Sequence, residues 1–357
     1  MKTYKHLYPQ IWAFENLLNA FYQARRGKPK TPELCAFEYQ LEENLFTLRD
    51  ELGAQTYRPG PYHNFYIHEP KKRLVSAAPF RDRVAHHALC NVLGPIFEAR
   101  FISDSYANRV GKGTHRALAR AQKFLLQNEF CFHGDILKCF PSIDHQILVE
   151  ILGRHIADDA VMNLIRLILK SGEGILADEY AMQWFEGDDL FAAVRPRGLP
   201  IGNLTSQFWA NVYLNELDTF VKHTLRLPYY VRYVDDILIF SNDKQELHHA
   251  RQEIARFLER LRLRLHPRKQ RVFPVRTGVD FLGFVSFPDR RKIRRENVKR
   301  FTQRLRRFQK EYSAGEISLA HAERSMHSWL AHARHADSYR LRSKILARVV
   351  WTAPPAV

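Results

Sequence analysis

The sequence predicts an α+β fold, and three observations lead to that class. Apolar residues recur at three- and four-residue spacing across residues 11–55 and 81–127, which is the period of amphipathic helices. Aromatic and β-branched runs at 129–137 and 229–240 have the length and composition of strands. Beyond Pro288 the chain returns to a helical pattern that is rich in Arg and Lys. Strands in the middle of the chain, with helices before and after them, predict an α+β protein.

Local patterning predicts each element in turn. Thr31 and Pro32 are typical of a helix start, because a Thr side chain caps the first turn and Pro fits its first position. Turn prolines and a basic cluster among aromatic and β-branched residues predict a hairpin within 58–80. The other expected elements are, in order, helices at 11–24, 31–52, 81–101, 113–127, 145–156 and 160–172, a polar connection, a helix at 204–221, a strand pair at 229–240, a helix at 244–265 and a short apolar segment at 279–287. No internal repeat or low-complexity linker separates them, so we expect the lobes to pack together.

The composition excludes several classes of protein. A chain of 357 residues with 45% hydrophobic residues can bury a large core. No stretch approaches the run of about 20 apolar residues that a membrane helix needs. The N-terminus lacks the apolar region of a signal peptide, so we expect a mature cytoplasmic protein without a membrane partner. The cysteines form no CxxC pair and no zinc spacing, which favours reduced packing residues: Cys35, Cys90, Cys131 and Cys139.

The charge balance favours a polyanionic partner. Lys and Arg number 55 against 38 Asp and Glu, which gives a formal net charge of +17. From Asp289 onward, 17 Lys and Arg stand against 6 Asp and Glu, so this last part carries a surplus of 11. We expect it to contact phosphates. A solvated basic face kept for solubility is the alternative.

Two of the predicted strands carry carboxylates in apolar surroundings. Asp135 ends the strand in FHGDILKCF, and Asp235 and Asp236 interrupt YVRYVDDILIF, whose two halves have the pattern of a hairpin. Buried carboxylates need a partner that neutralises them. If the strands are neighbours, Asp135 and Asp235 converge, and a pair of Mg²⁺ ions with substrate phosphates would hold the charge. A solvated Asp-Asp turn is the alternative.

Five motifs in one order carry a resemblance to a known family. YVDD resembles the Y-x-D-D box of reverse transcriptases, and DILKCF resembles their first acidic box. RPRGLPIGNLTSQF lies between them, where that family has its third box, and LHPRK and DFLGF follow in the family's order. The resemblance implies a right-hand polymerase fold with three parts. These are fingers at 1–130, a palm at 131–285 with an antiparallel sheet and helices on one face, and a basic helical thumb at 286–357.

The third box narrows the resemblance. Retron and group II intron enzymes read something like LPQG followed by SP, whereas this chain reads LPIGNLTSQFWANVYLN. That wording is similar to diversity-generating retroelement reverse transcriptases, within the group II intron and retron-like superfamily of prokaryotes. KKRLVSAAPFRDRVAHHALC and SDSYANRVGKGTHRAL resemble the same group, so the resemblance covers nearly the whole chain.

The resemblance implies the catalytic and metal-binding roles. Asp135, Asp235 and Asp236 are expected to act in catalysis and to hold two Mg²⁺ ions, for which Mn²⁺ can substitute. The Ile136 carbonyl is expected as a further ligand, and Asp236 is either a weaker ligand or a residue that orients the site. Lys269 in LHPRK matches a lysine that protonates the pyrophosphate leaving group. A surface lysine is the alternative.

Other matches concern the incoming nucleotide. Arg73 matches the finger arginine that grips the triphosphate, and Lys71 and Lys72 are expected to assist it. A solvated hairpin tip is the alternative for all three. Phe140 stands where the family places an aromatic ring under the sugar, so a ribose 2′-OH would collide with it and deoxynucleotides would be selected. A core Phe beside Pro141 is the alternative.

The third box departs from the common pattern at two positions. Ile201 replaces a glutamine that hydrogen-bonds near the nascent base pair, and the resemblance then implies frequent misincorporation opposite template adenine. Core packing would explain an Ile equally well. Gly202 is expected at the same nucleotide-binding site. Gln207, where the family usually has Pro, is a second departure, and no consequence follows from the sequence.

One further motif belongs to the predicted site, whereas a second motif and four histidines are not assigned to it. DFLGF resembles the primer grip of the family, with Phe281, Leu282 and Gly283 against the primer strand; an ordinary buried strand is the alternative. RVGKGTHRAL fails the phosphate-loop pattern, because Tyr106 and Gly113 occupy the positions of its first Gly and its Ser or Thr. Histidines without acidic or cysteine partners at ligand spacing are expected to be structural or RNA-facing: His86, His87, His332 and His335.

The expected function is RNA-directed DNA synthesis. As a nucleotidyltransferase, the protein would copy a template-repeat RNA into cDNA from dNTPs, with adenine-specific errors, for mutagenic retrohoming. The expected partners are template RNA, nascent cDNA and a small basic accessory variability protein. Two alternatives stay open: a reverse transcriptase of retron, group II intron or phage-defence lineage, and a non-catalytic RNA-binding scaffold. The intact Asp135, Asp235 and Asp236 argue against the scaffold, which has no need of that charge.

Overall fold

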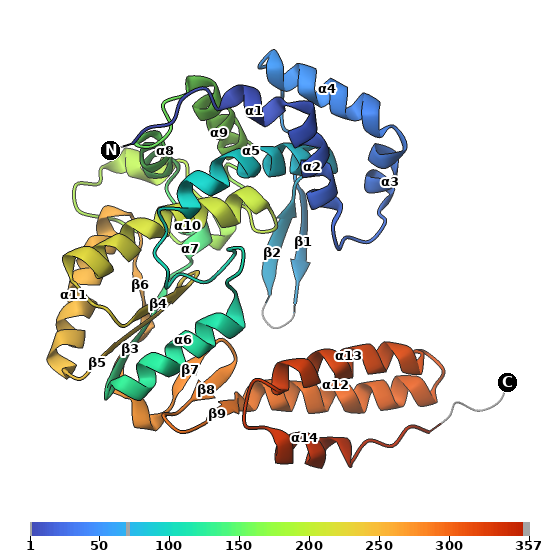
Figure 1. Cartoon of the computed structure of the whole chain (residues 1–357), viewed down its shortest axis with the longest axis vertical. Coiled ribbons are helices and arrows are strands. Elements are labelled where there is room, and N and C mark those ends of the chain that lie inside the picture. Colours follow the sequence, from blue (N-terminus) through green and yellow to red (C-terminus); the bar gives the residue numbers. More distant parts are fainter. Residues whose placement is uncertain (1, 69–71, 353–357) are drawn as a thin grey trace.

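The structure, a computed structural model, describes residues 2–68 and 72–352 (Figure 1). Along the chain, an N-terminal helical region is followed by a central antiparallel sheet and then by a group of C-terminal helices (Figure 1). The predicted α+β class is therefore confirmed. All four cysteines are free thiols. Lys71 lies outside the described residues, so its predicted role stays a prediction.

The N-terminal region contains helices and one hairpin. Its elements are α1 (Tyr8–Trp12), α2 (Phe14–Arg25), α3 (Pro32–Tyr39), α4 (Leu41–Gly53), β1 (His63–Ile67), β2 (Arg73–Ala77), α5 (Phe80–Glu98) and α6 (Thr114–Gln127). The predicted start of α3 is confirmed, because the Thr31 side chain accepts a hydrogen bond from the backbone N–H of Leu34. The prediction of two continuous helices at 11–24 and 31–52 was wrong. Each is broken, at Ala13 and Gln40, where the backbone leaves the helical region.

The central region carries a four-stranded sheet. Its elements are β3 (Phe130–Ile136), α7 (Cys139–Ser142), α8 (His145–Gly153), α9 (Asp159–Ser171), α10 (Leu204–Thr219), β4 (Tyr230–Tyr233), β5 (Asp236–Ser241), α11 (Lys244–Arg260) and β6 (Leu265–Pro274). The strand order is β4-β5-β3-β6 and every pairing is antiparallel. The predicted hairpin of β4 and β5 is confirmed. The helix predicted at 244–265 ends earlier, at Arg260, because Leu265 begins the edge strand β6.

Both faces of this sheet are covered. Phe132 and Ile239 point into the larger hydrophobic core, where α10 and α11 pack as the predicted helical layer. Leu238 and Phe240 lie on the opposite face in a second, smaller core. Here α6 packs against β4 and β5, and the ring of Phe124 lies 6.3 Å from that of Phe240. The prediction of helices on one face therefore omitted α6.

The C-terminal region combines a small sheet with basic helices. Its elements are β7 (Val279–Phe281), β8 (Phe284–Ser286), β9 (Arg291–Ile293), α12 (Arg295–Ser313), α13 (Leu319–Ala333) and α14 (Tyr339–Leu346). The expectation of helices alone beyond Pro288 was wrong, because β9 pairs with β8. Helices α12 and α13 lie side by side (Figure 1), and the rings of Phe301 and Trp329 stack at 3.9 Å. The division at residues 130 and 285 stays a prediction.

Candidate active site

The two acid-bearing strands meet in the middle of the sheet. Asp135 at the end of β3 and Asp236 at the start of β5 are Cα partners. Asp235 lies in the two-residue turn between β4 and β5, after Val234, whose φ of 57° is left-handed. The backbone N–H of Ile136 donates to the Asp235 carbonyl at 3.0 Å. The strands are therefore neighbours, as the sequence predicted.

The carboxyl of Asp235 lies in an unfavourable electrostatic environment. Burial, and then the negative charge of Asp135, raise its pKa from 3.8 to about 6. Lys269 on β6 partly offsets this charge, because its ammonium lies 3.0 Å from Oδ2 of Asp135. The Lys269 side chain is about half-exposed. A buried carboxyl whose ionisation is disfavoured by a neighbouring carboxylate gains from a bound cation.

The donor set at this turn fits a hard cation. Mg²⁺ takes oxygen ligands and commonly uses one or two protein carboxylates beside substrate phosphates. Within residues 2–68 and 72–352, no group of three or more His, Cys, Asp and Glu side chains is placed to hold a metal ion. Asp135 and Asp235 thus provide two carboxylates, and the remaining ligands would have to be backbone, substrate or water oxygens.

Asp236 has a partner that the sequence analysis did not identify. Nε2 of His133 lies 2.6 Å from Oδ1 of Asp236. Burial alone would lower the pKa of His133, but the hydrogen bond and charge of Asp236 outweigh burial and raise it. His133 stands two residues before Asp135, so both side chains lie on one face of β3. This pairing agrees with the predicted orienting role of Asp236 better than with a ligand role.

A buried ion pair lies next to the turn between β4 and β5 and supports it. Arg232 on β4 and Asp218 on α10 are both essentially inaccessible to solvent. The Arg232 guanidinium donates to both carboxylate oxygens of Asp218 at 2.7 Å, and the Tyr230 hydroxyl donates to the same group at 2.6 Å. A third guanidinium nitrogen, Nη1, donates to the Val234 carbonyl at 3.1 Å. Arg232 is therefore a positioning residue for the turn that carries Asp235.

The third box connects the N-terminal hairpin to the sheet region. The Ile201 carbonyl accepts a hydrogen bond from the Ser76 N–H at 2.8 Å, and the Asn203 side chain donates to the Ser76 carbonyl at 2.9 Å. Gly202 has a φ of +118°, and a Cβ there would lie 2.9 Å from Cγ1 of Val75. Only glycine fits this contact without strain. The box thus places strand β2 against the start of α10.

The predicted nucleotide-binding residues lie on three different elements. Lys72 and Arg73 are exposed at the start of β2, with the Lys72 ammonium 4.3 Å from the centre of the Tyr66 ring. Phe140 on α7 is half-buried against the larger core, and its carbonyl accepts from the Leu199 N–H at 2.9 Å. Gln207, in the first turn of α10, lines a cavity of about 240 Å³ together with Gly202, His86 and His87.

The DFLGF motif forms the β7–β8 hairpin. Phe281 is buried in the smaller core, which is the ordinary structural role. Leu282 and Gly283 both have positive φ, 49° and 87°, as a two-residue hairpin turn with this twist requires. The Gly283 carbonyl accepts from the Arg294 N–H, and a Cβ at Gly283 would lie 2.8 Å from Nδ2 of Asn297. The close backbone approach at Gly283 in this structure is therefore to α12.

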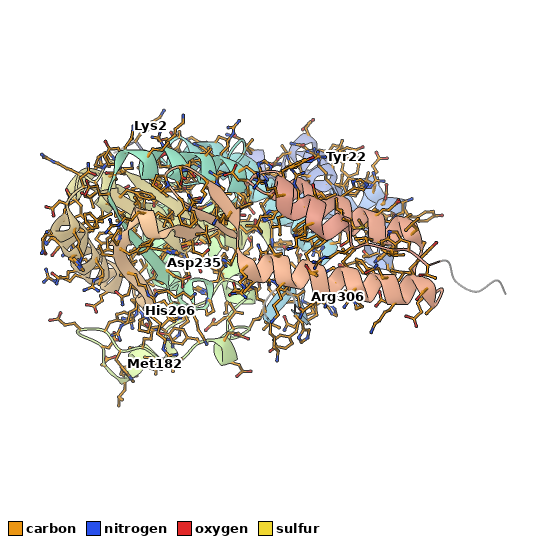
Figure 2. All side chains as sticks on the ribbon, turned by 90° about the horizontal axis from the view of Figure 1, so that it is seen from below. Lys2, Tyr22, Met182, Asp235, His266 and Arg306 are labelled. Atoms are coloured by element: carbon orange, nitrogen blue, oxygen red, sulfur yellow. The ribbon has the colours of Figure 1, made fainter. Side chains whose placement is uncertain are left out.

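A cavity of about 890 Å³ opens beside the aspartates. Asp135 and Asp236 line it from the sheet, and Asp280 and Arg294 line it from β7 and the start of α12. Its wall also carries the basic side chains of His248, Arg251, Arg268, Lys269 and Arg271. A cavity lined by both carboxylates and guanidinium groups suits a phosphate backbone that delivers a reactive group to bound cations. Figure 2 labels Asp235, which is half-buried.

Comparison with protein families decides between the possible classes. The family model described as reverse transcriptase (RNA-dependent DNA polymerase) matches residues 67–286, which is more than half of the chain. The chain belongs to the reverse transcriptase family. The predicted enzyme class, RNA-directed DNA polymerase, is confirmed at this level.

This reverse transcriptase is similar to several curated proteins. It is 26% identical to Protein YkfC of Escherichia coli (strain K12) over 284 residues, which covers 68% of this chain and 71% of YkfC. It is 30% identical to the Group II intron-encoded protein LtrA of Lactococcus lactis subsp. cremoris over 183 residues, which is 50% of this chain and 28% of LtrA. Nuclear intron maturase 2, mitochondrial, of Arabidopsis thaliana is 27% identical over 36% of this chain and 20% of its own. The chain thus spans under a third of LtrA and the maturase.

The four histidines named from the sequence of this reverse transcriptase are either buried or packed against other rings. Burial lowers the pKa of His86 to about 3 and that of His87 to about 4, so both are neutral at physiological pH. The His332 ring lies 4.4 Å from that of Phe284, and His335 stacks on another histidine ring at 3.5 Å.

None of the helices that the structure describes is long and apolar enough to cross a membrane.

Proposed function

We propose that this reverse transcriptase belongs to a diversity-generating retroelement and makes error-prone cDNA from a template-repeat RNA. The observation that carries the proposal is Ile201 in LPIGNLTSQ. Its backbone carbonyl holds strand β2 through Ser76, so the box keeps its structural task. Its half-buried side chain offers only hydrocarbon where a glutamine would offer hydrogen bonds. Selection at the nascent pair would then depend on base pairing and shape, which supports frequent errors, proposed to fall opposite template adenine.

In the proposed reaction, the 3′-OH of a DNA primer attacks the α-phosphate of a dNTP and pyrophosphate leaves. Two Mg²⁺ ions, or Mn²⁺ in their place, would activate the attacking oxygen and stabilise the leaving one. Asp135 and Asp235 are the residues that would hold them, with the Ile136 carbonyl as a further ligand. Asp236, through His133, would keep the turn in place. Lys269 lies close enough to Asp135 to serve as the acid that protonates pyrophosphate.

The remaining roles follow from where each side chain lies. Lys72 and Arg73, exposed on the β1–β2 hairpin, would grip the triphosphate, because a guanidinium makes paired bonds to phosphate oxygens. Phe140 would exclude a ribose 2′-OH. Gly202 would contact the new pair, and Gln207 would line the adjacent cavity on the nucleotide-binding side. The turn at Leu282 and Gly283 would support the primer.

Each of the three proposed lobes would have its own part in binding the substrates. Fingers at 1–130 and a palm at 131–285 would enclose the nucleotide, and a thumb at 286–357 would hold the RNA–DNA duplex through phosphates. Such contacts bind without reading sequence and weaken steeply with salt. A small basic accessory variability protein is the proposed protein partner.

Primer extension on an RNA template with dNTPs and Mg²⁺, followed by sequencing of the products, tests this function. The proposal expects errors concentrated at template adenines, fewer errors in Ile201→Gln, and no product from Asp235→Ala. Adding the co-expressed product of a neighbouring small gene tests the accessory protein. Accurate cDNA from the wild-type chain would favour a second candidate, a reverse transcriptase of group II intron or related lineage. The similarity to LtrA favours that candidate.

A further inference from the structure

The connection between α9 and α10 is acidic, in a protein that is basic as a whole. From Glu173 to Val194 it carries six acidic side chains and no Lys or Arg, in a protein whose net charge is +17. We call residues 173–194 the acidic segment. Apart from two short 3-10 turns, Ala177–Glu179 and Leu190–Val194, it has no regular secondary structure. Connections of this length inside a compact protein usually have a function of their own.

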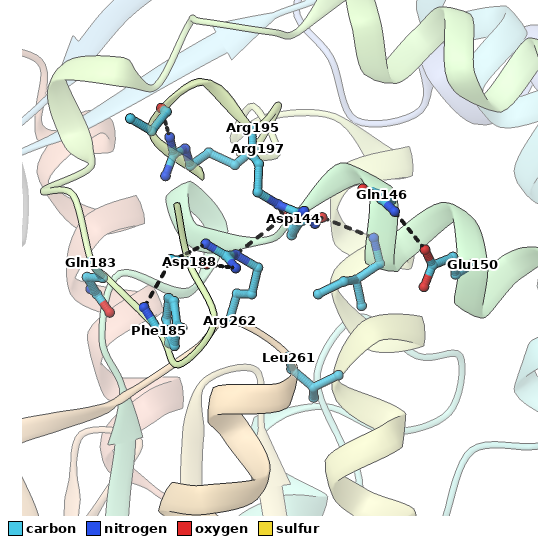
Figure 3. A network of polar contacts seen from close by, with 12 residues as sticks. Asp144, Gln146, Glu150, Gln183, Phe185, Asp188, Arg195, Arg197, Leu261 and Arg262 are labelled. Carbon is cyan, nitrogen blue, oxygen red and sulfur yellow. Dashed lines mark hydrogen bonds and ion pairs between the residues drawn. The ribbon is translucent and has the colours of Figure 1, made fainter. Parts of the chain in front are cut away.

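The acidic segment is held in a defined position by arginines of the central region. Arg262, just after α11, donates to both oxygens of Asp188 at 2.6 and 2.8 Å (Figure 3). Arg195, immediately after the segment, donates to both oxygens of Asp144 at 2.7 and 3.1 Å (Figure 3). Phe185 is buried beneath the Arg262 guanidinium, which lies 5.0 Å from the centre of its ring. These contacts anchor the segment against the sheet region without using its outer side chains.

The outer side of the acidic segment exposes large apolar side chains. Leu190, Phe191 and Val194 are 83%, 77% and 74% exposed, and Trp184 is 48% exposed. Beside them is a cavity of about 360 Å³, which Val194 and Met182 help to line. Figure 2 shows Met182 at the outer edge of the molecule, well away from Asp235. Apolar side chains gathered on an anchored surface usually mark a protein–protein contact.

The charges around these apolar side chains determine which partner fits. Four carboxylates of the segment are exposed: Glu173, Asp178, Glu186 and Asp189. Three cations of the central region, Lys138, Arg197 and Arg264, donate hydrogen bonds to backbone carbonyls of the segment. The six carboxylates of the segment outnumber these cations, so the surface suits a basic partner better than RNA or DNA, which the basic surfaces of the chain attract. A partner with Lys and Arg around an apolar centre is complementary in both respects.

We propose that the acidic segment is a docking surface for a basic protein. Leu190, Phe191 and Val194 form its apolar centre, and the exposed carboxylates pair with Lys and Arg of the partner. The inference does not rest on the retroelement assignment, because it follows from charge and exposure alone. It also places the partner on a surface separate from the cavity at the aspartates.

A synthetic probe tests the docking surface on the full-length protein. The probe is a fluorescein-labelled helical peptide of about 20 Leu and Lys residues, with one apolar face, and binding is read by fluorescence anisotropy. Because the protein carries a net charge of +17, most of its surface should repel such a cation. The variants Leu190→Ser with Phe191→Ser, and Asp178→Lys with Glu186→Lys, should each weaken binding by about tenfold or more.

Matched controls separate this surface from general exposure and charge. Tyr39→Ser, on the 90% exposed Tyr39 of α3, and Glu42→Lys, on α4, change similar groups elsewhere and should alter binding by less than about twofold. Primer extension by the segment variants should match that of the wild-type chain, which shows that they fold. A peptide with Glu in place of Lys should not bind.

Four results would overturn the proposal. The first is failure of the wild-type protein to bind the Lys peptide, and the second is equal weakening by the segment and control variants. The third is weaker binding of a labelled RNA–DNA duplex by Leu190→Ser with Phe191→Ser than by the wild-type chain, which would make the segment part of the nucleic-acid surface. The fourth is a concentration-dependent dimer in sedimentation that Leu190→Ser with Phe191→Ser abolishes, since the occupant would then be a second copy of this chain.

Discussion

Replacing Asp235 with Asn should stabilise the folded protein at neutral pH when no divalent cation is present. In the folded protein, burial and the charge of Asp135 raise the Asp235 pKa from 3.8 to about 6. A rise of that size means that ionised Asp235 costs the folded state about 3 kcal/mol relative to the unfolded chain. Asn keeps the shape of the side chain and removes the charge. The expected gain is several degrees in melting temperature, at roughly 2–4 °C per kcal/mol.

The pH dependence gives this prediction its sign. Because the folded-state pKa lies above the unfolded value, the protonated carboxyl favours folding below pH 3.8, and that benefit is lost as the pH rises through about 6. The advantage of Asp235→Asn over the wild-type chain should therefore be largest near pH 8 and disappear towards pH 4. Thermal unfolding in EDTA, followed by intrinsic fluorescence at each pH, measures it.

A neighbouring carboxylate supplies the control. Asp236→Asn removes the charge that His133 pairs with, so it should lower the melting temperature where Asp235→Asn raises it. The reasoning would be refuted if Asp235→Asn were no more stable than the wild-type chain at pH 8. A gain of the same size at pH 4 would also refute it, because charge would then not be the cause.

Three further predictions concern the support of the site. Asp218→Asn leaves the Arg232 guanidinium buried without its counter-charge and should cost about 3–5 kcal/mol in urea unfolding, with loss of primer extension; an unchanged midpoint would contradict this. Gly202→Ala should lower the free energy of unfolding by about 1–3 kcal/mol, because Gly202 has a positive φ and lies against β2. The control Gly94→Ala, in open space within α5, should be neutral or stabilising in the same unfolding assay. Equal effects of the two substitutions would show that the third-box contact is unimportant. Millimolar Mg²⁺ should raise the melting temperature of the wild-type chain and not that of Asp235→Asn, and an equal rise in both would place the cation elsewhere.

Much of the fold was predictable because its signals are local. Thr31 and Pro32 begin a helix through side-chain and backbone chemistry that needs no distant partner. Asp135 and Asp235 were identifiable because carboxylates are out of place in apolar strands, and the pairing of β3 with β5 then brings them together. These two aspartates alone did not identify a family. The family was identified from the order of five motifs, which local patterning does not supply.

The partners of the site residues were not predictable because they come from distant parts of the chain. Arg232 lies in an apolar strand and its partner Asp218 lies on α10, and no spacing rule joins a helix to a strand. His133 becomes the partner of Asp236 only through strand register. β6 was missed because Pro and several basic residues mask a strand pattern, which is typical of an edge strand that must resist further pairing.

Helix interruptions were the other failure of local reasoning. The apolar spacing continues across Ala13 and Gln40, so periodicity alone predicts uninterrupted helices. In the structure the side-chain amide of Asn16 donates to the carbonyls of Gln10 and Ile11, just before the break at Ala13. Hydrogen bonds from a side chain to these carbonyls lower the energetic cost of interrupting the helix. Where such a side chain lies depends on tertiary packing.

Single-nucleotide incorporation on an RNA template by Asp235→Asn tests the central claim most directly, which is that the Asp135 and Asp235 pair performs RNA-directed DNA synthesis. This variant should be at least as stable as the wild-type chain, so a loss of activity cannot be attributed to unfolding. We predict a loss of about 10³-fold or more in the rate of dNTP addition with Mg²⁺ present. A rate within about tenfold of the wild-type value would contradict the account, because the reaction would then not depend on the carboxylate at this turn.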